Sequence, residues 1–247
     1  MRVLYWIGDV LATTPHLVRR LKQLQPSARE GSLDLLLVST RGNEKLAQEL
    51  GIRQTRYFPF GYSPKVHSVS AASPPRSPYR WLITFVAAAD PARARFIREL
   101  NGRLPFPVTL FGPNWHRFGL KAGPRVTLPA SLQIHAASQI SLNHMKAEVD
   151  GGMNMRFYEI PAAGGFQICS FQTEIATSPL WETPTYRNVE ECARLILYYL
   201  ENVHERETLR MRLSEVVRSE CSYTRLFGEV LKELAVEPPG CQCTANH

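Results

Sequence analysis

The sequence predicts an α/β fold with parallel sheets, arranged in two halves. Two observations carry this prediction: apolar runs alternate with segments of helical periodicity over residues 3–64, and the alternation restarts at residue 81. The run LDLLLVST at 33–40 is nearly continuous in apolar residues, which is typical of a strand covered on both faces. Strands that alternate with helices return by crossover connections and form parallel sheets.

The first half, residues 1–62, predicts a partial N-terminal domain. Strands are expected at 3–8, 33–40 and 55–64. Between them, TPHLVRRLKQLQ has leucines and a valine at helical spacing, and NEKLAQELG predicts a short helix that ends at Gly51.

A linker and a larger second half follow. Residues 63–80 are rich in Pro and Ser and lack periodicity, so we expect a linker between two domains. Residues 81–235 then predict a C-terminal domain, and residues 236–247 predict a disordered tail. The expected strands of this half are 81–89, 106–113, 125–130 (RVTLPA), 140–145 (ISLNHM) and 166–170 (FQICS); its helices are 90–102 with Pro91 in the first turn, 155–165, a long helix from Asn188 capped with Glu191, and a pair across 204–235.

The charge and the cysteine content narrow the range of binding partners and cellular compartments that we expect. The formal net charge of +7 favours anionic partners, but the basic residues are scattered and form no block of five, so nucleic acid is not expected. The five cysteines include no CxxC and no cluster with histidine at zinc spacing, which indicates free thiols. We therefore expect a cytoplasmic protein whose basic surface leaves peripheral contact with an anionic membrane open.

The segment NMRFYEIPAAGGFQICSF, residues 154–171, is the best candidate for a binding site. Arg156 and Glu159 stand near the start of an expected helix, and Gly164 and Gly165 separate that helix from an apolar strand. Ligands of open parallel sheets bind at the carboxyl edge, where a helix N-terminus suits phosphate. Arg156 would add a bidentate donor, and Glu159 could accept hydrogen bonds from a sugar diol. The alternative is an i,i+3 surface pair followed by an ordinary glycine C-cap.

The same segment resembles the C-terminal part of the CgeB-like (spore maturation protein type) glycosyltransferases. The likeness rests on the N-x-R-x-x-E-x-x-A-x-G-G core that begins at Asn154, on the strand ISLN before it and on the long helical region after it. It extends from about residue 33 to 235 and is most specific over 138–171. The resemblance implies a GT-B-like fold, in which two Rossmann-like domains with parallel sheets face each other across a cleft. The N-terminal domain would be incomplete, because only residues 1–62 precede the linker.

The resemblance also implies roles for individual residues. Glu159 would bind the ribose hydroxyls of a nucleotide-sugar donor, while Arg156 and the amides near Gly164 and Gly165 would face the diphosphate. Arg93 occupies the position of a recurrent arginine of the family. The other donor-binding residues that the resemblance implies are Gly112 and Pro113, which would border the base, and Asn143 and Asn154.

Catalysis is expected to involve Arg156, as stabiliser of the leaving diphosphate, and Asp9, as base toward an acceptor hydroxyl. Asp9 stands at the carboxyl end of the first expected strand; the alternative is a helix N-cap or a loop carboxylate. No D-x-D occurs, so no metal site is expected, and the nucleotide-sugar acts as co-substrate without a further cofactor. Where the wider group often has a second glutamate, this sequence has Gly151, which leaves contact with the transferred sugar undefined.

The sequence thus predicts a metal-independent glycosyltransferase that moves a sugar from a nucleotide-sugar donor to an unidentified acceptor. One alternative is a non-catalytic module that binds a nucleotide or nucleotide-sugar, or a fragment of a longer glycosyltransferase. Another is a basic α/β protein associated with nucleic acid. Donor turnover separates the enzyme from the module, and salt-dependent retention of oligonucleotide would identify the last alternative.

Overall fold

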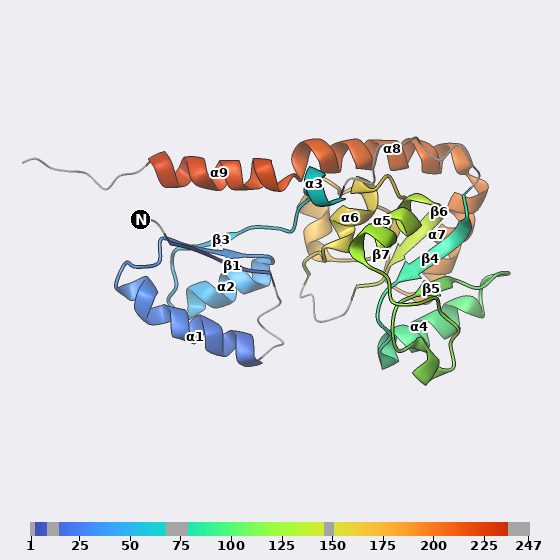
Figure 1. Ribbon diagram of the computed structural model, residues 1–247, viewed down its shortest axis with the longest axis horizontal. Coiled ribbons are helices and arrows are strands. Elements are labelled where there is room, and N and C mark those ends of the chain that lie inside the picture. Colours follow the sequence, from blue (N-terminus) through green and yellow to red (C-terminus); the bar gives the residue numbers. More distant parts are fainter. Residues whose placement is uncertain (1–2, 9–14, 68–78, 146–150, 237–247) are drawn as a thin grey trace, which may run out of the picture.

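The computed structural model shows two lobes, each built on a parallel β-sheet (Figure 1). This confirms the predicted α/β class. It describes residues 3–8, 15–67, 79–145 and 151–236. We call residues 3–60 together with helix α9 (Tyr223–Val236) the N-lobe, residues 61–67 the crossing segment, and residues 79–220 the C-lobe.

The N-lobe sheet contains three parallel strands in the order β1-β2-β3. Helices α1 and α2 cover one face of it (Figure 1), where Leu21 and Ala47 are fully buried against residues such as Leu36. Helix α2 begins where the Thr40 hydroxyl accepts a hydrogen bond from the Asn43 backbone N–H at 3.0 Å. The bounds are β1 Leu4–Ile7, α1 Pro15–Arg29, β2 Leu35–Val38, α2 Arg41–Glu49 and β3 Thr55–Tyr57.

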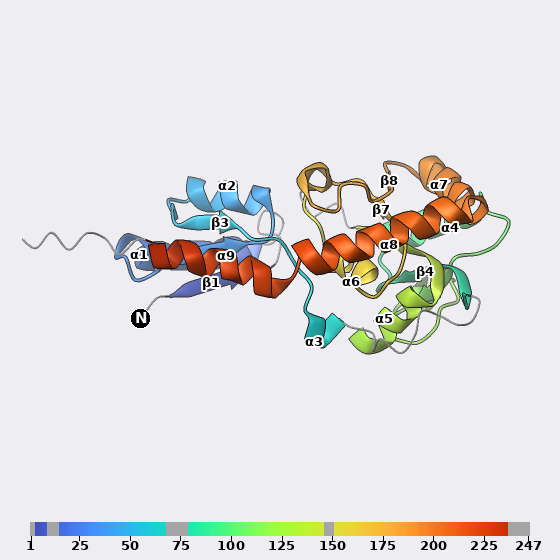
Figure 2. The ribbon, with the colours of Figure 1, turned by 90° about the horizontal axis from the view of Figure 1, so that it is seen from above.

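The last helix of the described chain covers the opposite face of the N-lobe sheet. Val230 of α9 packs with Leu37 and Phe58, and all three are buried. Leu36 and Leu37 belong to different apolar clusters because successive side chains of a strand point to opposite faces. The chain therefore runs along the C-lobe in α8 (Val203–Glu220) and returns over the N-lobe in α9 (Figures 1 and 2). The sequence-based boundary at residue 235 placed this helix in the C-terminal domain, whereas its apolar side packs on the N-lobe.

The C-lobe contains five parallel strands and one large apolar core. Helices α5, α6 and α8 lie on one side of the sheet and α4 and α7 on the other. The crossing segment contains the short helix α3, which packs on α5. The bounds are α3 Pro64–His67, β4 Trp81–Val86, α4 Pro91–Asn101, β5 Thr109–Phe111, α5 Leu128–Ala136, β6 Ser138–Asn143, α6 Arg156–Ala162, β7 Gln167–Ser170, β8 Thr185–Tyr186, α7 Val189–Glu201 and α8 Val203–Glu220, with 3₁₀ helices at Trp115–Phe118 and Thr173–Thr177.

The strand order of the C-lobe positions the site. The order is β5-β4-β6-β7-β8, so the chain moves outward from β4 to β5 and then crosses to β6 on the other side of β4. The loops that follow β4 and β6 diverge at this reversal and leave a crevice at the carboxyl edge of the sheet. A ligand site is therefore expected beyond Val86 and Asn143, the last residues of these two strands.

The predicted starts of two helices are confirmed: Pro91 lies in the first turn of α4, and Asn188 caps α7. The side chain of Asp90 accepts a hydrogen bond from the Arg93 backbone N–H at 2.9 Å, with Pro91 in the first turn of α4. The side chain of Asn188 accepts one from the Glu191 backbone N–H at 2.8 Å, which starts α7. Local sequence signals therefore fix where these two helices begin.

Two expected elements differ from the structure. The segment RVTLPA, residues 125–130, is not a strand: α5 begins within it, with Pro129 in its first turn. The prediction was wrong because α5 is buried on several sides, as the exposures of Leu132 (2%), Ile134 (7%) and His135 (1%) show, so no polar stripe reveals a helical period. Helix α3 lies in the range expected as a linker, and residues 68–78 of that range are outside the described residues.

Candidate functional site

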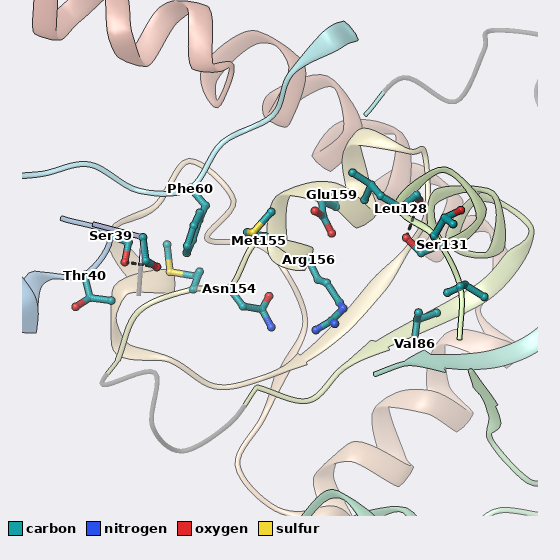
Figure 3. Close-up of a pocket in the computed structure, with 14 residues that line it drawn as sticks. Ser39, Thr40, Phe60, Val86, Leu128, Ser131, Asn154, Met155, Arg156 and Glu159 are labelled. Atoms are coloured by element: carbon teal, nitrogen blue, oxygen red, sulfur yellow. Dashed lines mark hydrogen bonds between the residues drawn. The ribbon is translucent and has the colours of Figure 1, made fainter. Parts of the chain in front are cut away.

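A cleft of about 470 Å³ lies between the two lobes. It is lined from one side by loops that follow the N-lobe strands and from the other by β4, α5 and α6 of the C-lobe (Figure 3). The lining residues are Gly8, Ser39, Thr40, Phe60, Val86, Val126, Thr127, Leu128, Ser131, Met153, Asn154, Met155, Arg156 and Glu159.

The N-lobe wall is uncharged at the described residues. Gly8 follows β1, Ser39 and Thr40 follow β2, and Phe60 lies beyond β3, so the carboxyl ends of all three strands face the cleft. The Ser39 hydroxyl donates to the Gly8 carbonyl at 3.1 Å, which fixes the two loops relative to each other. A Cβ at residue 8 would lie 3.2 Å from the Phe60 ring, so a small residue is favoured there.

The first turn of α5 forms part of the C-lobe wall. Residues 126–128 and Ser131 line the cleft, and no side chain caps this helix at Thr127. The first backbone N–H groups of a helix have no partner within the helix and carry a partial positive charge. This turn therefore offers an anion a favourable potential beside Val86.

Two asparagines anchor the start of α6. The side chain of Asn154 accepts from the Phe157 backbone N–H at 3.0 Å and donates to Asn143 Oδ1 at 2.9 Å. Asn143 Nδ2 donates back to Asn154 Oδ1 at 3.2 Å and to Gln167 Oε1 at 3.3 Å. Asn143 is 1% exposed, whereas Asn154 lines the cleft. The pair ties the helix to the ends of β6 and β7.

Arg156 and Glu159 both line the cleft, one turn apart on α6. Figure 3 shows the side chains of Arg156 and Asn154 extending into the same opening, with Glu159 above them in this view. Burial raises the pKa of the Glu159 carboxyl, and the Arg156 charge opposes this rise. Burial lowers the pKa of the Arg156 guanidinium, and the Glu159 charge opposes that change. The two groups therefore support each other's charged state in a partly dehydrated place.

Glu159 also faces a histidine of the crossing segment. Its Oε1 atom lies 3.8 Å from His67 Nε2, and the two side chains are nearly buried. Burial lowers the pKa of His67, which favours the neutral imidazole. His67 is far from the 154–171 segment along the chain, so its place beside Glu159 could not be predicted from the sequence.

A second histidine lies in the polar interior of the C-lobe. His135 of α5 is 1% exposed, and its Nδ1 atom is 3.0 Å from the Ser141 hydroxyl of β6. Burial, followed by the charge of Arg156, lowers the pKa of His135 to about 3. The neutral imidazole therefore adds no positive charge near Arg156.

Several residues expected at the site lie elsewhere. Arg93 is 7% exposed and donates to the Ala88 carbonyl at 3.2 Å and the His144 carbonyl at 3.4 Å, so it joins the loops after β4 and β6 without lining the cleft. Gly112 and Pro113 follow the edge strand β5 and do not line the cleft either. A Cβ on Gly112, whose φ is +123°, would lie 2.3 Å from the Ala87 carbonyl.

The two glycines after α6 close that helix. Gly164 has a φ of +78°, its N–H donates to the Pro161 carbonyl at 3.0 Å, and the Gly165 N–H donates to the Ile160 carbonyl at 2.9 Å. This is the hydrogen-bond pattern of a Schellman C-cap. Neither glycine lines the cleft. Asp9 lies outside the described residues.

Sequence reasoning brought together Asn154, Arg156 and Glu159, which share one cleft. It missed Ser39, Phe60 and the first turn of α5. The available signal for the N-lobe residues was their position at the carboxyl ends of expected strands, because those ends meet at one edge of a parallel sheet.

Within the described part of the chain, no group of three or more His, Cys, Asp or Glu side chains is placed to hold a metal ion. None of the described helices is both long and apolar enough to cross a membrane. Cys169, Cys192 and Cys221 are free and buried, as expected for small apolar core residues.

Three solved structures illustrate the similarity of this chain to known folds. The Anabaena protein HepE, solved in complex with UDP and glucose, is 14% identical, with 96% of this chain and 72% of that chain covered and a TM-score of 0.69. Sucrose-phosphate synthase from Thermosynechococcus elongatus is 13% identical, with 94% of this chain and 67% of that chain covered and a TM-score of 0.66. The trehalose-6-phosphate synthase OtsA is 14% identical, with 97% of this chain and 68% of that chain covered and a TM-score of 0.67. These likenesses show a shared GT-B fold.

The family of this chain follows from a comparison of its sequence with family models. No curated protein matches it. A family model described as Glycosyl transferase-like matches residues 93–232, a range that contains Asn154, Arg156 and Glu159 and more than half of the chain. The chain therefore belongs to the glycosyl transferase-like family.

Proposed function

We propose that this glycosyltransferase binds a nucleoside diphosphate sugar in the interlobe cleft and transfers the sugar to an acceptor hydroxyl. The observation that carries the proposal is the position of Arg156 and Glu159, a guanidinium and a carboxylate one helical turn apart on the wall of a cleft of about 470 Å³. The cleft lies at the strand reversal between β4 and β6, where α/β sheets bind nucleotides. The N-x-R-x-x-E-x-x-A-x-G-G core supports the CgeB-like subtype.

The diphosphate is assigned to Arg156 and the first turn of α5. Arg156 offers a planar pair of donors, and among the described residues no carboxylate lies within ion-pairing distance of it. The uncapped N-terminus of α5 adds a partial positive charge on the same wall. Arg93 contributes indirectly, since it holds the loops after β4 and β6.

The ribose is assigned to Glu159, whose two carboxylate oxygens can accept hydrogen bonds from a diol. The apolar side chains of Val86, Val126 and Leu128 offer a surface for the base on the same wall. UDP is the first nucleotide to test, because HepE was solved in complex with UDP and glucose.

In the proposed reaction the bond from the anomeric carbon to the β-phosphate oxygen breaks, and a bond from that carbon to the acceptor oxygen forms. The proton of the acceptor hydroxyl passes to a base, for which Asp9 remains the proposal. The leaving nucleoside diphosphate gains negative charge, which Arg156 and the α5 N-terminus stabilise. Because these protein groups supply the positive charge, we expect turnover to persist in the presence of a chelator.

The experiment compares binding and turnover in wild-type protein, Glu159→Ala and the exposed control Glu215→Ala. Thermal shift and calorimetry with UDP, GDP and ADP identify the nucleotide, because a ligand that binds only folded protein raises its melting temperature. Consumption of the matching nucleotide-sugar then measures catalysis. We expect Glu159→Ala to lose at least about ten-fold in affinity and Glu215→Ala to behave as wild type.

Three other outcomes have distinct meanings. Binding without turnover by the wild-type protein would support a non-catalytic module. Retention of full affinity in Glu159→Ala would remove the ribose assignment. Failure of every nucleoside diphosphate to bind would refute the proposed donor site.

A further inference from the structure

His67 is a buried residue of the crossing segment that reaches the wall of the cleft from behind. It ends helix α3, is 5% exposed, and its ring lies 6.2 Å from the ring of Tyr62. Because α3 packs on α5, the residue is held between the segment that joins the two lobes and a helix that lines the cleft. Its only close carboxylate among the described residues is Glu159.

The backbone determines which nitrogen of His67 carries the proton. The Ser63 backbone N–H donates to His67 Nδ1 at 2.8 Å, so Nδ1 must be without a proton. A doubly protonated ring would place two N–H groups against each other there. The imidazole is therefore neutral, with its single proton on Nε2, the atom that faces Glu159.

The distance between this donor and the carboxylate is informative. His67 Nε2 and Glu159 Oε1 are 3.8 Å apart, which is longer than an N–H···O hydrogen bond. A shift of the carboxylate by less than about 1 Å would bring the atoms to hydrogen-bond distance. A ligand diol that binds the other side of the carboxylate would favour such a shift, because donors on both sides then satisfy its oxygens.

We propose that His67 is a positioning residue of the donor site: its Nε2–H holds the Glu159 carboxylate, ionised and oriented, for the two ribose hydroxyls. This inference rests on the proposed function, since it assumes that Glu159 binds the ribose. It goes further in giving the crossing segment a direct part in donor selection. A fixed carboxylate distinguishes a ribose from a deoxyribose more strongly than a mobile one, because a mobile carboxylate can rotate to bind the remaining hydroxyl better.

The test measures this discrimination with UDP and 2′-deoxy-UDP. Calorimetry gives the ratio of the two dissociation constants for wild-type protein, for which we expect about ten-fold or more in favour of UDP. His67→Gln places an amide donor near the position of Nε2, and His67→Asn places an acceptor near Nδ1 but has no donor that reaches Glu159. We expect the ratio to stay within about two-fold of wild type in His67→Gln and to fall to about three or less in His67→Asn.

A second measurement uses wild-type protein alone and so does not depend on the folding of a variant. Imidazole ¹⁵N spectra should show His67 as the neutral Nε2–H form, with an Nε2–H resonance that shifts on addition of UDP and less on addition of 2′-deoxy-UDP. A ring protonated on Nδ1, or a resonance that the two nucleotides move equally, would overturn the inference.

The outcomes separate this inference from the proposed function. Normal binding of UDP, loss of affinity in Glu159→Ala and an unchanged ratio in both His67 variants would remove the role of His67 and leave the donor site in place. A ratio lost equally in His67→Gln and His67→Asn would indicate a packing role and also overturn the inference. If no nucleoside diphosphate binds wild-type protein, the proposed function fails and this inference fails with it.

Discussion

The two walls of the cleft differ in charge. The C-lobe wall presents Arg156, Glu159 and the first turn of a helix, whereas the described residues of the N-lobe wall, Gly8, Ser39, Thr40 and Phe60, carry no charge. A nucleoside diphosphate needs fixed positive charge, but an acceptor hydroxyl needs only shape and a proton acceptor. The difference is consistent with the proposal that the donor is bound mainly by the C-lobe and that the N-lobe closes the other side.

The two lobes also differ in the size and continuity of their apolar cores. The C-lobe has one continuous apolar cluster that includes residues of every strand from β4 to β8. The N-lobe core is divided by its sheet into two smaller clusters, and one of them is completed by Val230 of α9. The C-lobe wall of the cleft is therefore supported by an extensive core, while the N-lobe wall depends on a helix that is far away along the chain.

The largest expected effect comes from the charged wall. Arg156→Met removes the guanidinium that we propose to face the diphosphate, while it keeps much of the side-chain volume. We expect a loss of about 10²- to 10³-fold in kcat/KM for donor turnover, because a charge-stabilising donor is removed from a partly buried site. Arg156→Lys keeps the charge but not the paired donors, and should recover part of this loss.

Ser39→Ala is the matched change on the neutral wall. It removes the hydroxyl that donates to the Gly8 carbonyl, and we expect less than about ten-fold loss in kcat/KM because no charge is removed. The contrast between the walls would be broken by a Ser39→Ala variant that loses as much activity as Arg156→Met at unchanged stability.

The second prediction concerns the N-lobe core. Val230→Asp places a carboxylate against Leu37 and Phe58, which are apolar and buried, within a cluster whose other members are partly buried hydrophobic side chains. We expect a loss of about 3 kcal/mol or more in the stability of the N-lobe, since burial of an unpaired charge is strongly unfavourable. Hydrogen exchange should show faster opening of the β2 amides and little change in β4 and β6.

Leu231→Asp is the control for this change. Leu231 is the next residue of α9 and is 60% exposed, so a carboxylate there remains in water. It should leave exchange in β2 nearly unchanged. Equal acceleration of β4 and β6 in Val230→Asp would show that the two lobes unfold as one unit.

The third prediction concerns His144, a half-buried histidine of the C-lobe. Burial, followed by the Arg93 charge, lowers the pKa of His144 to about 4. Because the ordinary value is about 6.5, the unfolded chain binds one more proton between these pH values, and the free energy of unfolding falls as pH falls through this window. At pH 5 we expect this residue to reduce stability by about 2 kcal/mol.

The test is the pH dependence of unfolding in His144→Asn, whose amide keeps a partner for the Tyr186 hydroxyl, 2.9 Å from His144 Nδ1. Unfolding of His144→Asn takes up about one proton fewer than unfolding of the wild-type protein between about pH 4.5 and 6. The slope of the free energy of unfolding against pH should therefore be smaller in the variant, by at most about 1.4 kcal/mol per pH unit. The exposed His204→Gln variant controls for the removal of a histidine as such. An unchanged slope in His144→Asn would show that His144 is protonated alike in both states.

Sequence reasoning succeeded where the determining interactions are local. Apolar runs predicted the strands β1 to β7 but not the two-residue strand β8. The spacing of Asn154, Arg156 and Glu159 placed three cleft residues together, because Asn154 directly precedes α6 and the other two lie in its first turns. It failed for α5, whose sides are covered by other elements, so that burial hides the helical period. It also could not place α9: an amphipathic pattern indicates a helix, but Leu37 and Phe58, its partners, are more than a hundred residues away. His67 was missed for the same reason of distance.

The smallest expected effect comes from a substitution at Gly164, which with Gly165 follows α6 just outside the C-lobe wall of the cleft. The sequence allowed two interpretations of this pair, a close approach to the donor or a helix C-cap. The N–H of Gly164 donates within the cap at a φ of +78°, and neither glycine lines the cleft. We therefore expect Gly164→Ala to cost about 1 kcal/mol of stability, the strain of a left-handed alanine, and to leave the dissociation constant for UDP within about two-fold. Thermal unfolding and calorimetry on the same sample measure both quantities. A ten-fold loss of UDP affinity at unchanged melting temperature would extend the donor wall to this end of α6, and the diphosphate would then have to reach the amides of the glycine pair.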